Sequence, residues 1–357
     1  MKRILMGAIA SVMISTAAPA VEIESRTLDQ LYTAAKEEGG NLVLWAGGDK
    51  PDQSDFILDM FKEDFPDINV IHRVDLSKYH APRFDNALEN GGEVPDVIQL
   101  QTLYDFDYWT RRGELLAYKP KDWDKVYPAY RDPNGHWTGL FGVSFSNLIN
   151  TDLIGEDKAP RDAMDYLDPA LKGKVILTYP HDDDAVLYQF WHLKQKYGWD
   201  YLEKLVANEP VWVRGTSMPY VAIGSGWYPA SFTTSWSLVP FQDSPVKFLL
   251  PKKDFFLTWI QTAAIPAKAK NKATAKLYTS WMLSKRFQSK WLQWPVRTDV
   301  EAPGGFKAVQ HHNTSPEDFH RFMLDRATQE RFRFQMEQLV GPIEGVSPLD
   351  MDYGLKP

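Results

Sequence analysis

Three consecutive aspartates, Asp182, Asp183 and Asp184, stand directly before a segment with the apolar periodicity of a buried helix. Carboxylates in the first turn of a helix are stabilised by the helix dipole, by about 0.3–1 kcal/mol each, and one of them can cap free N–H groups. One aspartate would be enough for a cap, and three in a row repel one another. Two interpretations stay open: the aspartates cap the helix and are solvated, or at least one faces a ligand cleft and favours a cation.

A second polar stretch, RGTSMP, begins at Arg214 and is typical of a tight turn before a short helix, with Thr216 or Ser217 as the N-cap. Arg214 could bind a carboxylate through two hydrogen bonds, and the two hydroxyls could add donors. An ordinary helix cap beside a solvated arginine is the competing interpretation. If this turn and the aspartates share one cleft, a zwitterionic ligand would satisfy both.

The first twenty residues have the layout of a secretory signal peptide. Two cations at positions 2 and 3 precede an apolar run from 4 to 14, and small residues extend to position 20. The run is too short to span a bilayer, and no later segment approaches eighteen uninterrupted apolar residues. We therefore predict a signal peptide at 1–20 and a mature protein that is periplasmic or secreted, without a membrane anchor.

Composition excludes several classes of function. The absence of cysteine rules out disulfides, thiolate metal sites and lipid attachment at an N-terminal cysteine. The formal net charge of −7 becomes −9 without the two cations at positions 2 and 3, which argues against nucleic acid as a partner. The roughly 337 residues after position 20 exceed what one compact core usually holds, so we expect two lobes.

Short apolar runs alternate with amphipathic segments along the chain, which predicts an α/β protein with a mostly parallel sheet. Thr27 is the predicted cap of a first helix that ends at Gly39, and Ser315 is the predicted cap of a C-terminal helix. Further helices are expected at 54–64, 82–89, 185–198 and 216–226, and strands at 41–48, 68–75, 95–100, 174–179, 211–215, 228–236 and 246–251.

Three segments carry a resemblance to a known family: LYTAAKEEGGNLVLWAGG, GHWTGLFGVSFSNLINTDLI and YLDPALKGKVILTYP. They resemble, in this order, the opening helix and first strand, the first crossing between lobes and the start of the second lobe in the extracellular solute-binding proteins of ABC importers. The similarity is to the branch that includes ferric-ion-binding receptors, and it extends at low identity over roughly residues 27–300.

The resemblance implies a two-lobed α/β fold of the type II periplasmic-binding-protein kind, with the ligand cleft between lobes joined by two crossing segments. The crossings would fall near 139–150 and 256–266, which places residues 21–142 and 264–357 in lobe 1 and residues 143–263 in lobe 2. Such receptors close on a small-molecule ligand by hinge motion, and a membrane permease recognises the closed form. We expect a monomer with an ABC permease as partner.

The iron ligands of the ferric receptors do not carry over. Their first-strand histidine falls at Asp49, the glutamate after the third strand at Gln101, and the tyrosine pair at Ser235 and Trp236. Ferric iron prefers phenolate and carboxylate oxygens, so the resemblance argues against iron held in the family's usual way. We expect no cofactor and no resident metal, and a metal receptor that uses His181 and the aspartates remains an alternative.

The last candidates are four aromatic residues that fall where the resemblance places the cleft. They are Trp45, Trp227, Tyr228 and Trp236. An indole face can stack on a flat ligand or hold a cation, for about 0.5–2 kcal/mol per contact. Core packing is the competing interpretation for each of them.

The chain contains no nucleophile elbow, zinc-protease motif or phosphate-binding loop, so we expect binding without catalysis; a secreted enzyme on the same scaffold is the alternative. The expected function is that of an exported receptor for a small polar ligand, cationic or zwitterionic. The candidate ligand-binding residues are Asp49, Gln101, Asp182, Asp183, Asp184, Arg214, Thr216, Ser217, Trp227 and Trp236.

Overall fold

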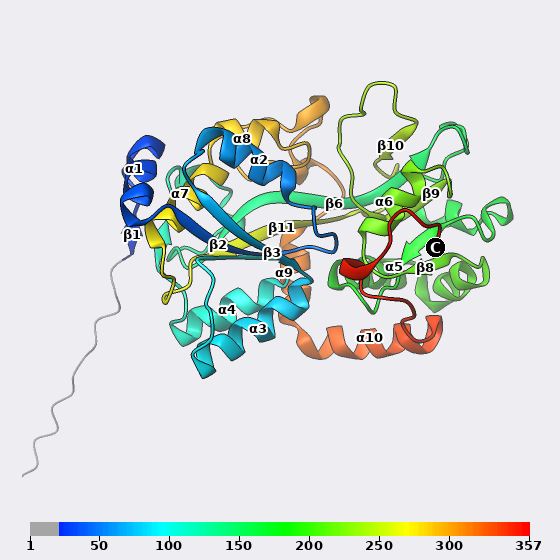
Figure 1. Cartoon of the computed structure of the whole chain (residues 1–357). Helices are drawn as coiled ribbons and strands as arrows, with labels where there is room; N and C mark the ends of the chain where they lie inside the picture. Colours follow the sequence, from blue (N-terminus) through cyan, green and yellow to red (C-terminus); the bar gives the residue numbers. More distant parts are fainter. Residues whose placement is uncertain (1–20) are drawn as a thin grey trace, which may run out of the picture.

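The computed structural model describes residues 21–357, so the predicted signal peptide lies outside the described residues. Two halves stand side by side, each with strands covered by helices (Figure 1). Among the helices of residues 21–357, none is both long and apolar enough to cross a bilayer.

Two long antiparallel strands run through both halves (Figure 1). They are β6 (Thr138–Asn150) and β11 (Leu257–Ala264), which pair from Phe145 opposite Leu257 to Thr138 opposite Ala263. The last residues of β6 pair instead with strands of the second half. These strands occupy the predicted crossings at 139–150 and 256–266, and the two-lobed α/β fold is confirmed.

The first half is built on parallel strands β2 (Asn41–Gly47), β3 (Asn69–Asp75) and β4 (Val97–Leu100). All four residues of β4 are buried, as expected of an apolar strand covered on both faces. The strand order β10-β6-β11-β4-β2-β3, with β9 beside β6, joins these strands to the crossing pair in one mixed sheet.

The second half contains the parallel pair β7 (Ile176–Thr178) and β8 (Val211–Val213), and strands β9 (Ala230–Thr234) and β10 (Val246–Leu249), which pair with the end of β6. Its main helices follow β7 and β8 directly, so their N-termini lie at the carboxyl ends of these strands. They are α5 (Asp184–Ala207) and α6 (Ser217–Gly224).

Several predicted helices are present with their caps. Thr27 forms a capping box at α1 (Leu28–Glu38), and α2 (Asp55–Asp64) begins one residue after the predicted start. The predicted start of the next helix at Pro82 was wrong, because α3 (Ser77–Asn90) contains Pro82 in its interior. Proline favours the first turn of a helix, because in the interior it removes one backbone hydrogen bond and its ring crowds the carbonyl of the preceding turn; α3 accommodates both.

Helix α5 is longer than predicted because Gly198 does not end it. This glycine has φ 77°, and the helix resumes after the kink and continues to Ala207. Besides short 3-10 helices, the remaining elements are β1 (Glu22–Ile23), β5 (Tyr118–Lys119), α4 (Leu103–Arg112), α7 (Lys272–Met282), α8 (Lys285–Lys290), α9 (Pro316–Leu324) and α10 (Arg326–Val340).

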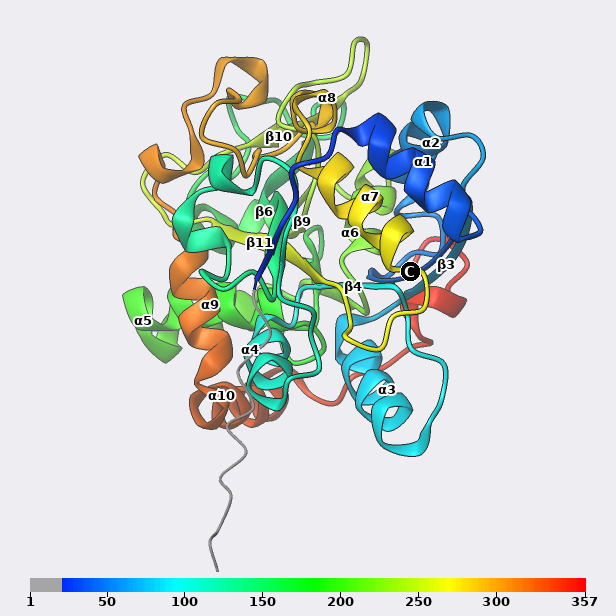
Figure 2. The same cartoon turned by 90° about the vertical axis from the view of Figure 1, so that its left-hand side faces the viewer.

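Helix α1 lies beside α7 on one side of the sheet, and α9 and α10 lie away from them, at the lower left in Figure 2. Ser315 caps α9, as predicted, by accepting a hydrogen bond from the backbone N–H of Asp318. Helix α9 packs on β11, α4 and α5, and α10 packs on α5. The predicted division, with 264–357 in lobe 1, would separate α10 from the helix that it covers; the boundary itself stays a prediction.

The crossing strands approach their neighbours closely at two glycines. A Cβ at Gly142 would lie 2.8 Å from Cβ of Trp294, and one at Gly139 would lie 2.3 Å from Cγ2 of Ile260. Contacts under 3 Å force backbone or core shifts, so glycine is required at both positions.

We predict that Gly142→Ala lowers the free energy of unfolding by about 1–3 kcal/mol, because the added methyl group overpacks the β6–Trp294 contact. Urea unfolding measures this change. The control is Gly224→Ala, since a Cβ at Gly224 meets nothing within 4 Å. Equal stability of Gly142→Ala and wild type would contradict the close packing of β6.

Candidate functional site

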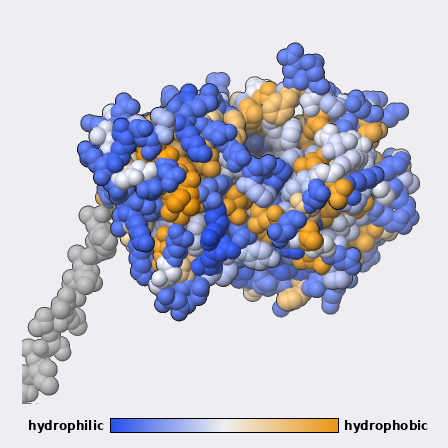
Figure 3. Space-filling model, in the orientation of Figure 1, coloured by the Kyte–Doolittle hydropathy of each residue, from blue (hydrophilic) through white to orange (hydrophobic). Residues whose placement is uncertain are grey.

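A cavity of about 530 Å³ lies between the two halves. Its walls are the carboxyl ends of β2 and β4, parts of β6 and β11, and the N-termini of α2, α3, α5 and α6. The surface is hollowed between the halves (Figure 3). Ligands of α/β proteins bind at the carboxyl ends of strands, and this volume is sufficient for a small organic molecule.

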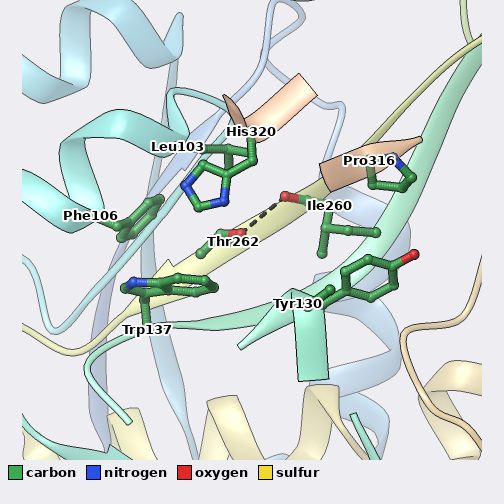
Figure 4. A pocket seen from close by; sticks show the side chains of 9 residues that line it. Leu103, Phe106, Tyr130, Trp137, Ile260, Thr262, Pro316 and His320 are labelled. Carbon is green, nitrogen blue, oxygen red and sulfur yellow. Dashed lines mark hydrogen bonds between the residues drawn. The ribbon is translucent and has the colours of Figure 1, made fainter. Parts of the chain in front are cut away.

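A second pocket, near α9, is too small to be the ligand site. It measures about 20 Å³, room for about one water molecule. Within it, the Thr262 hydroxyl donates to the Ile260 carbonyl at 3.0 Å (Figure 4). The other labelled residues are Leu103, Phe106, Tyr130, Trp137, Pro316 and His320.

Most of the candidate residues meet at the large cavity. The candidates that line it are Asp49, Gln101, Asp182, Asp183, Asp184, Thr216, Ser217 and Trp236. Two candidates do not line it: Arg214 bonds to Asp182, and Trp227 packs against an apolar cluster around Met218 and Ile223. Trp45 is also part of a core, stacked on His80.

Asp49 reaches across the cavity from the end of β2 to the N-terminus of α6. Its carboxylate accepts hydrogen bonds from the backbone N–H groups of Thr216 and Ser217 and from both hydroxyls. The Thr216 side chain, in the N-cap position, makes no cap bond of its own. The helix is therefore capped by a carboxylate 167 residues away in the chain.

Asp182 joins three parts of the molecule. It accepts from Nζ of Lys78 at 2.6 Å, at the start of α3, and from Nε of Arg214 at 2.9 Å. Burial alone would raise the pKa of Asp182, but the hydrogen bonds and charges of Arg214 and Lys78 hold it below the ordinary value. Asp182 is thus ionised, and its charge is matched by protein cations.

Asp183 is the N-cap of α5. Its Oδ1 accepts from the backbone N–H groups of Ala185 at 2.9 Å and Val186 at 3.0 Å, and Gln101 Nε2 lies 3.5 Å away. Burial raises the pKa of Asp183 to about 6, and the neighbouring charges of Asp184 and Asp49 act in the same direction. Asp183 therefore combines features of both interpretations, since it caps α5 and also lines the cavity.

Asp184 lines the cavity but is buried, and its partners lie on α10. Its Oδ1 accepts from Arg333 of α10 and from Gln329 Nε2 at 2.9 Å. The three aspartates therefore have three different partners: two cations, a helix terminus, and a side-chain pair on α10.

Aromatic side chains form much of the remaining wall. They come from both halves and are Phe56, Phe141, Phe145, Tyr220, Trp236, Phe241, Trp259 and Trp291. Phe56 and Phe241 are half exposed, which places them at the edge of the cavity. The Nε1 atom of Trp236 and the hydroxyl of Thr102 are buried and have no hydrogen-bond partner among residues 21–357.

The sequence analysis missed several residues that line the cavity, among them Lys78, Tyr220, Gln261 and Gln293. Lys78 follows β3 in the first turn of α3, and the rule that ligands bind at carboxyl ends of strands could have indicated it. Gln261 lies within the crossing strand β11, where only its pairing register reveals which way it points.

The positions of the ferric receptors' ligands meet in the same cavity, since Asp49, Gln101, Ser235 and Trp236 all line it. In residues 21–357, no group of three or more His, Asp or Glu side chains is arranged to hold a metal ion. His181 is buried but does not line the cavity.

Comparison with known proteins identifies the family. The bacterial extracellular solute-binding proteins match residues 57–314 of the chain, more than half of its length, and the chain belongs to this family. No curated protein matches the chain significantly in sequence.

Solved structures share the fold. The iron-bound HitA from Pseudomonas aeruginosa has a TM-score of 0.64 at 16% identity, and the alignment covers 83% of this chain and 99% of HitA. The substrate-binding protein of an ABC transporter from Agrobacterium tumefaciens has a TM-score of 0.70 at 16% identity, with 84% and 94% covered. AfuA from Actinobacillus pleuropneumoniae, with fructose-6-phosphate bound, has a TM-score of 0.66 at 19% identity, with 85% and 99% covered.

The family is one of solute-binding proteins. The protein is therefore an extracellular solute-binding protein. The family also implies export to the periplasm.

We predict that Asp183→Asn removes part of the pH dependence of stability. Because the folded pKa of Asp183 is raised to about 6, the folded state keeps a proton that the unfolded state loses, and the free energy of unfolding falls as pH rises from about 4 to about 6. The variant should gain about 2 kcal/mol relative to wild type across this window, measured by urea unfolding at several pH values.

The control is Asp325→Asn, which changes the N-cap of α10. The side-chain and backbone hydrogen bonds from Thr328 lower the pKa of Asp325, so its contribution to stability changes only below about pH 4. Between about pH 4 and 6 the profile of Asp325→Asn should therefore run parallel to that of wild type. Identical pH profiles of Asp183→Asn and wild type would contradict the burial of this carboxyl group.

Proposed function

We propose that this receptor captures a small organic solute with a cationic group and delivers it to an ABC permease. The charges at the cavity support this proposal. Lys78 and Arg214 match Asp182, and Arg333 matches Asp184. Asp49 and Asp183 also line the cavity, and neither forms an ion pair with a cation of residues 21–357. A cavity with a negative electrostatic potential attracts cations and repels anions.

Asp183 carries the proposal, because it offers an unused acceptor. All of its hydrogen bonds within residues 21–357 go to Oδ1, and Oδ2 accepts none. The Oδ2 atom is not buried, so a ligand in the cavity that Asp183 lines can reach it. An ammonium or guanidinium group of the ligand would gain a charge-assisted hydrogen bond there.

The aromatic wall supports an organic cation over a hydrated metal ion. Trp236 and Phe241 from one half, and Phe56 from the other, offer ring faces or edges to a ligand. Contact of a cation with an indole face contributes about 0.5–2 kcal/mol. Buried Nε1 of Trp236 adds one donor for a ligand acceptor atom.

A zwitterionic ligand is less well supported than a simple cation. Its negative end would need the donors at Thr216 and Ser217, which Asp49 uses, or Arg214, which Asp182 uses. The same argument applies to a sugar phosphate such as that bound by AfuA. Iron, as bound by HitA, would need oxygen donors that the cavity does not assemble from residues 21–357. A metal held through His181 has the further difficulty that this side chain does not line the cavity.

Native mass spectrometry of the purified protein tests the proposal, with bound material released and identified. We expect a retained or added organic amine to bind and to raise the Tm, in a panel of amines, amino acids, sugar phosphates and metal ions. Tight binding of a metal ion or a sugar phosphate, with no response to any amine, would overturn the proposal.

We predict that Asp183→Asn weakens binding of the identified cation by about tenfold or more, because the amide keeps a cap for α5 but removes the charge at Oδ2. Calorimetric titration measures the change. Asp325→Asn caps a helix at a distance from the cavity and should bind as wild type does. Unchanged affinity of Asp183→Asn would mean that the cation is held elsewhere in the cavity.

A further inference from the structure

The Asp49 clasp, defined here as the Asp49 carboxylate and its donors in Thr216 and Ser217, is held rigidly on the side of the first half. The backbone N–H of Asp49 donates to Oε1 of Gln53 at 2.9 Å, and the Tyr353 hydroxyl donates to the Asp49 carbonyl at 2.9 Å. Asp49 is only 5% exposed. Its main chain is thus fixed on both sides, and the side chain is directed toward α6.

The donors in the second half, on Thr216 and Ser217, are held as rigidly as Asp49. Gly215 adopts φ 71°, and a Cβ there would lie 3.0 Å from Oδ2 of Asp49. The Thr178 hydroxyl donates to the Gly215 carbonyl at 2.8 Å, and the Thr234 hydroxyl donates to the Thr216 carbonyl at 2.6 Å. These bonds turn the carbonyl groups away and direct the N–H groups of the next residues toward Asp49.

The C-terminal segment after α10 reinforces the same junction (red in Figure 1). Pro348 contacts Gly215 in the second half, since a Cβ on Gly215 would lie 2.7 Å from Pro348. Tyr353 bonds to Asp49 and lies under the ammonium group of Lys50 at 5.7 Å from the ring centroid. The segment therefore contacts both halves at the clasp.

The clasp has the donors of an anion-binding site, and a carboxylate of the same chain occupies that site. Two backbone N–H groups at a helix N-terminus, with two hydroxyls, are the usual donors for a bound phosphate or carboxylate. Here a carboxylate of the chain itself uses all of them. A second anion at this place would have to displace Asp49 and would be repelled by it.

We propose that Asp49 is a specificity-determining residue: it holds the two halves together through α6 and, by filling the helix terminus, excludes ligands that carry an anionic group. The inference rests on the proposed function in that it explains why the cavity would select a cation. The clasp can nevertheless be tested without any knowledge of the ligand.

The test compares wild type, Asp49→Ala and Asp49→Asn, with Asp52→Ala as the matched control. Asp52 is an exposed aspartate three positions away that pairs with Lys50 and does not line the cavity. The probe is inorganic phosphate at millimolar concentration, read as a change in Tm, together with small-angle X-ray scattering of the ligand-free proteins.

We expect phosphate to raise the Tm of Asp49→Ala by several degrees and to leave wild type and Asp52→Ala unchanged, because only the first variant frees the donors at α6. We expect scattering from Asp49→Ala to show a larger radius of gyration than wild type, and Asp52→Ala to match wild type. Asp49→Asn keeps a side chain of the same size but cannot repel phosphate, so it covers the case in which the alanine variant does not fold.

Two results would overturn the proposal. One is a wild-type protein that phosphate stabilises as strongly as it stabilises the Asp49 variants, since the helix terminus would then be free in solution. The other is a pair of Asp49 variants that match wild type in both measurements. If wild type binds no organic cation but phosphate stabilises only the Asp49 variants, the result contradicts the proposed function and leaves the clasp intact.

A double-mutant cycle between Asp49→Asn and Ser217→Ala separates the clasp from general loss of structure. The two residues exchange a direct hydrogen bond, so their effects on the free energy of unfolding should not add. Additive effects would show that the contact does not contribute in solution, and would overturn the clasp.

Discussion

The antiparallel pairing of β6 with β11 is the interaction on which the rest of the structure depends. These strands are shared by both halves, and Gly139 and Gly142 allow Ile260 and Trp294 to approach them closely. Because the pair fixes how the halves face one another, the carboxyl ends of β2 and β4 meet the N-termini of α5 and α6. The cavity results from this arrangement. Its charges and polar groups are those of the residues at the ends of these strands and at the starts of these helices.

Those residues bring four carboxylates into a partly dry space, where each needs donors or cations to offset its loss of hydration. Asp49 obtains them from a helix terminus in the other half, Asp182 from Lys78 and Arg214, Asp183 from its own helix, and Asp184 from Arg333. Two of these solutions, at Asp49 and at Asp182 with Lys78, connect the halves. The contacts that stabilise these carboxylates therefore also hold the two halves together.

The sequence was sufficient for the parts of this arrangement that depend on local pattern. The cap at Thr27, the strand at 41–48 and the aspartates before α5 are all visible in short stretches. The crossing at 139–150 came instead from the resemblance to a known family. What could not be predicted is pairing over long distances. Arg214 was assigned to a ligand, yet it binds Asp182, and the role of Lys78 depends on a partner 104 residues away. Trp227 and Trp236 were equivalent by composition, and only the packing distinguishes them.

Helix α9 limits how such a molecule can open. It packs on β11 between α4, in the first half, and α5, in the second, with buried Phe319 against Tyr188 of α5. Bending the crossing strands alone would separate α4 from α5, and α9 cannot follow both. A relative motion of the two halves would therefore have to break or shift the contacts of α9 with α4 or with α5. The packing of α9 on both halves therefore resists opening, although no residue of α9 lines the cavity.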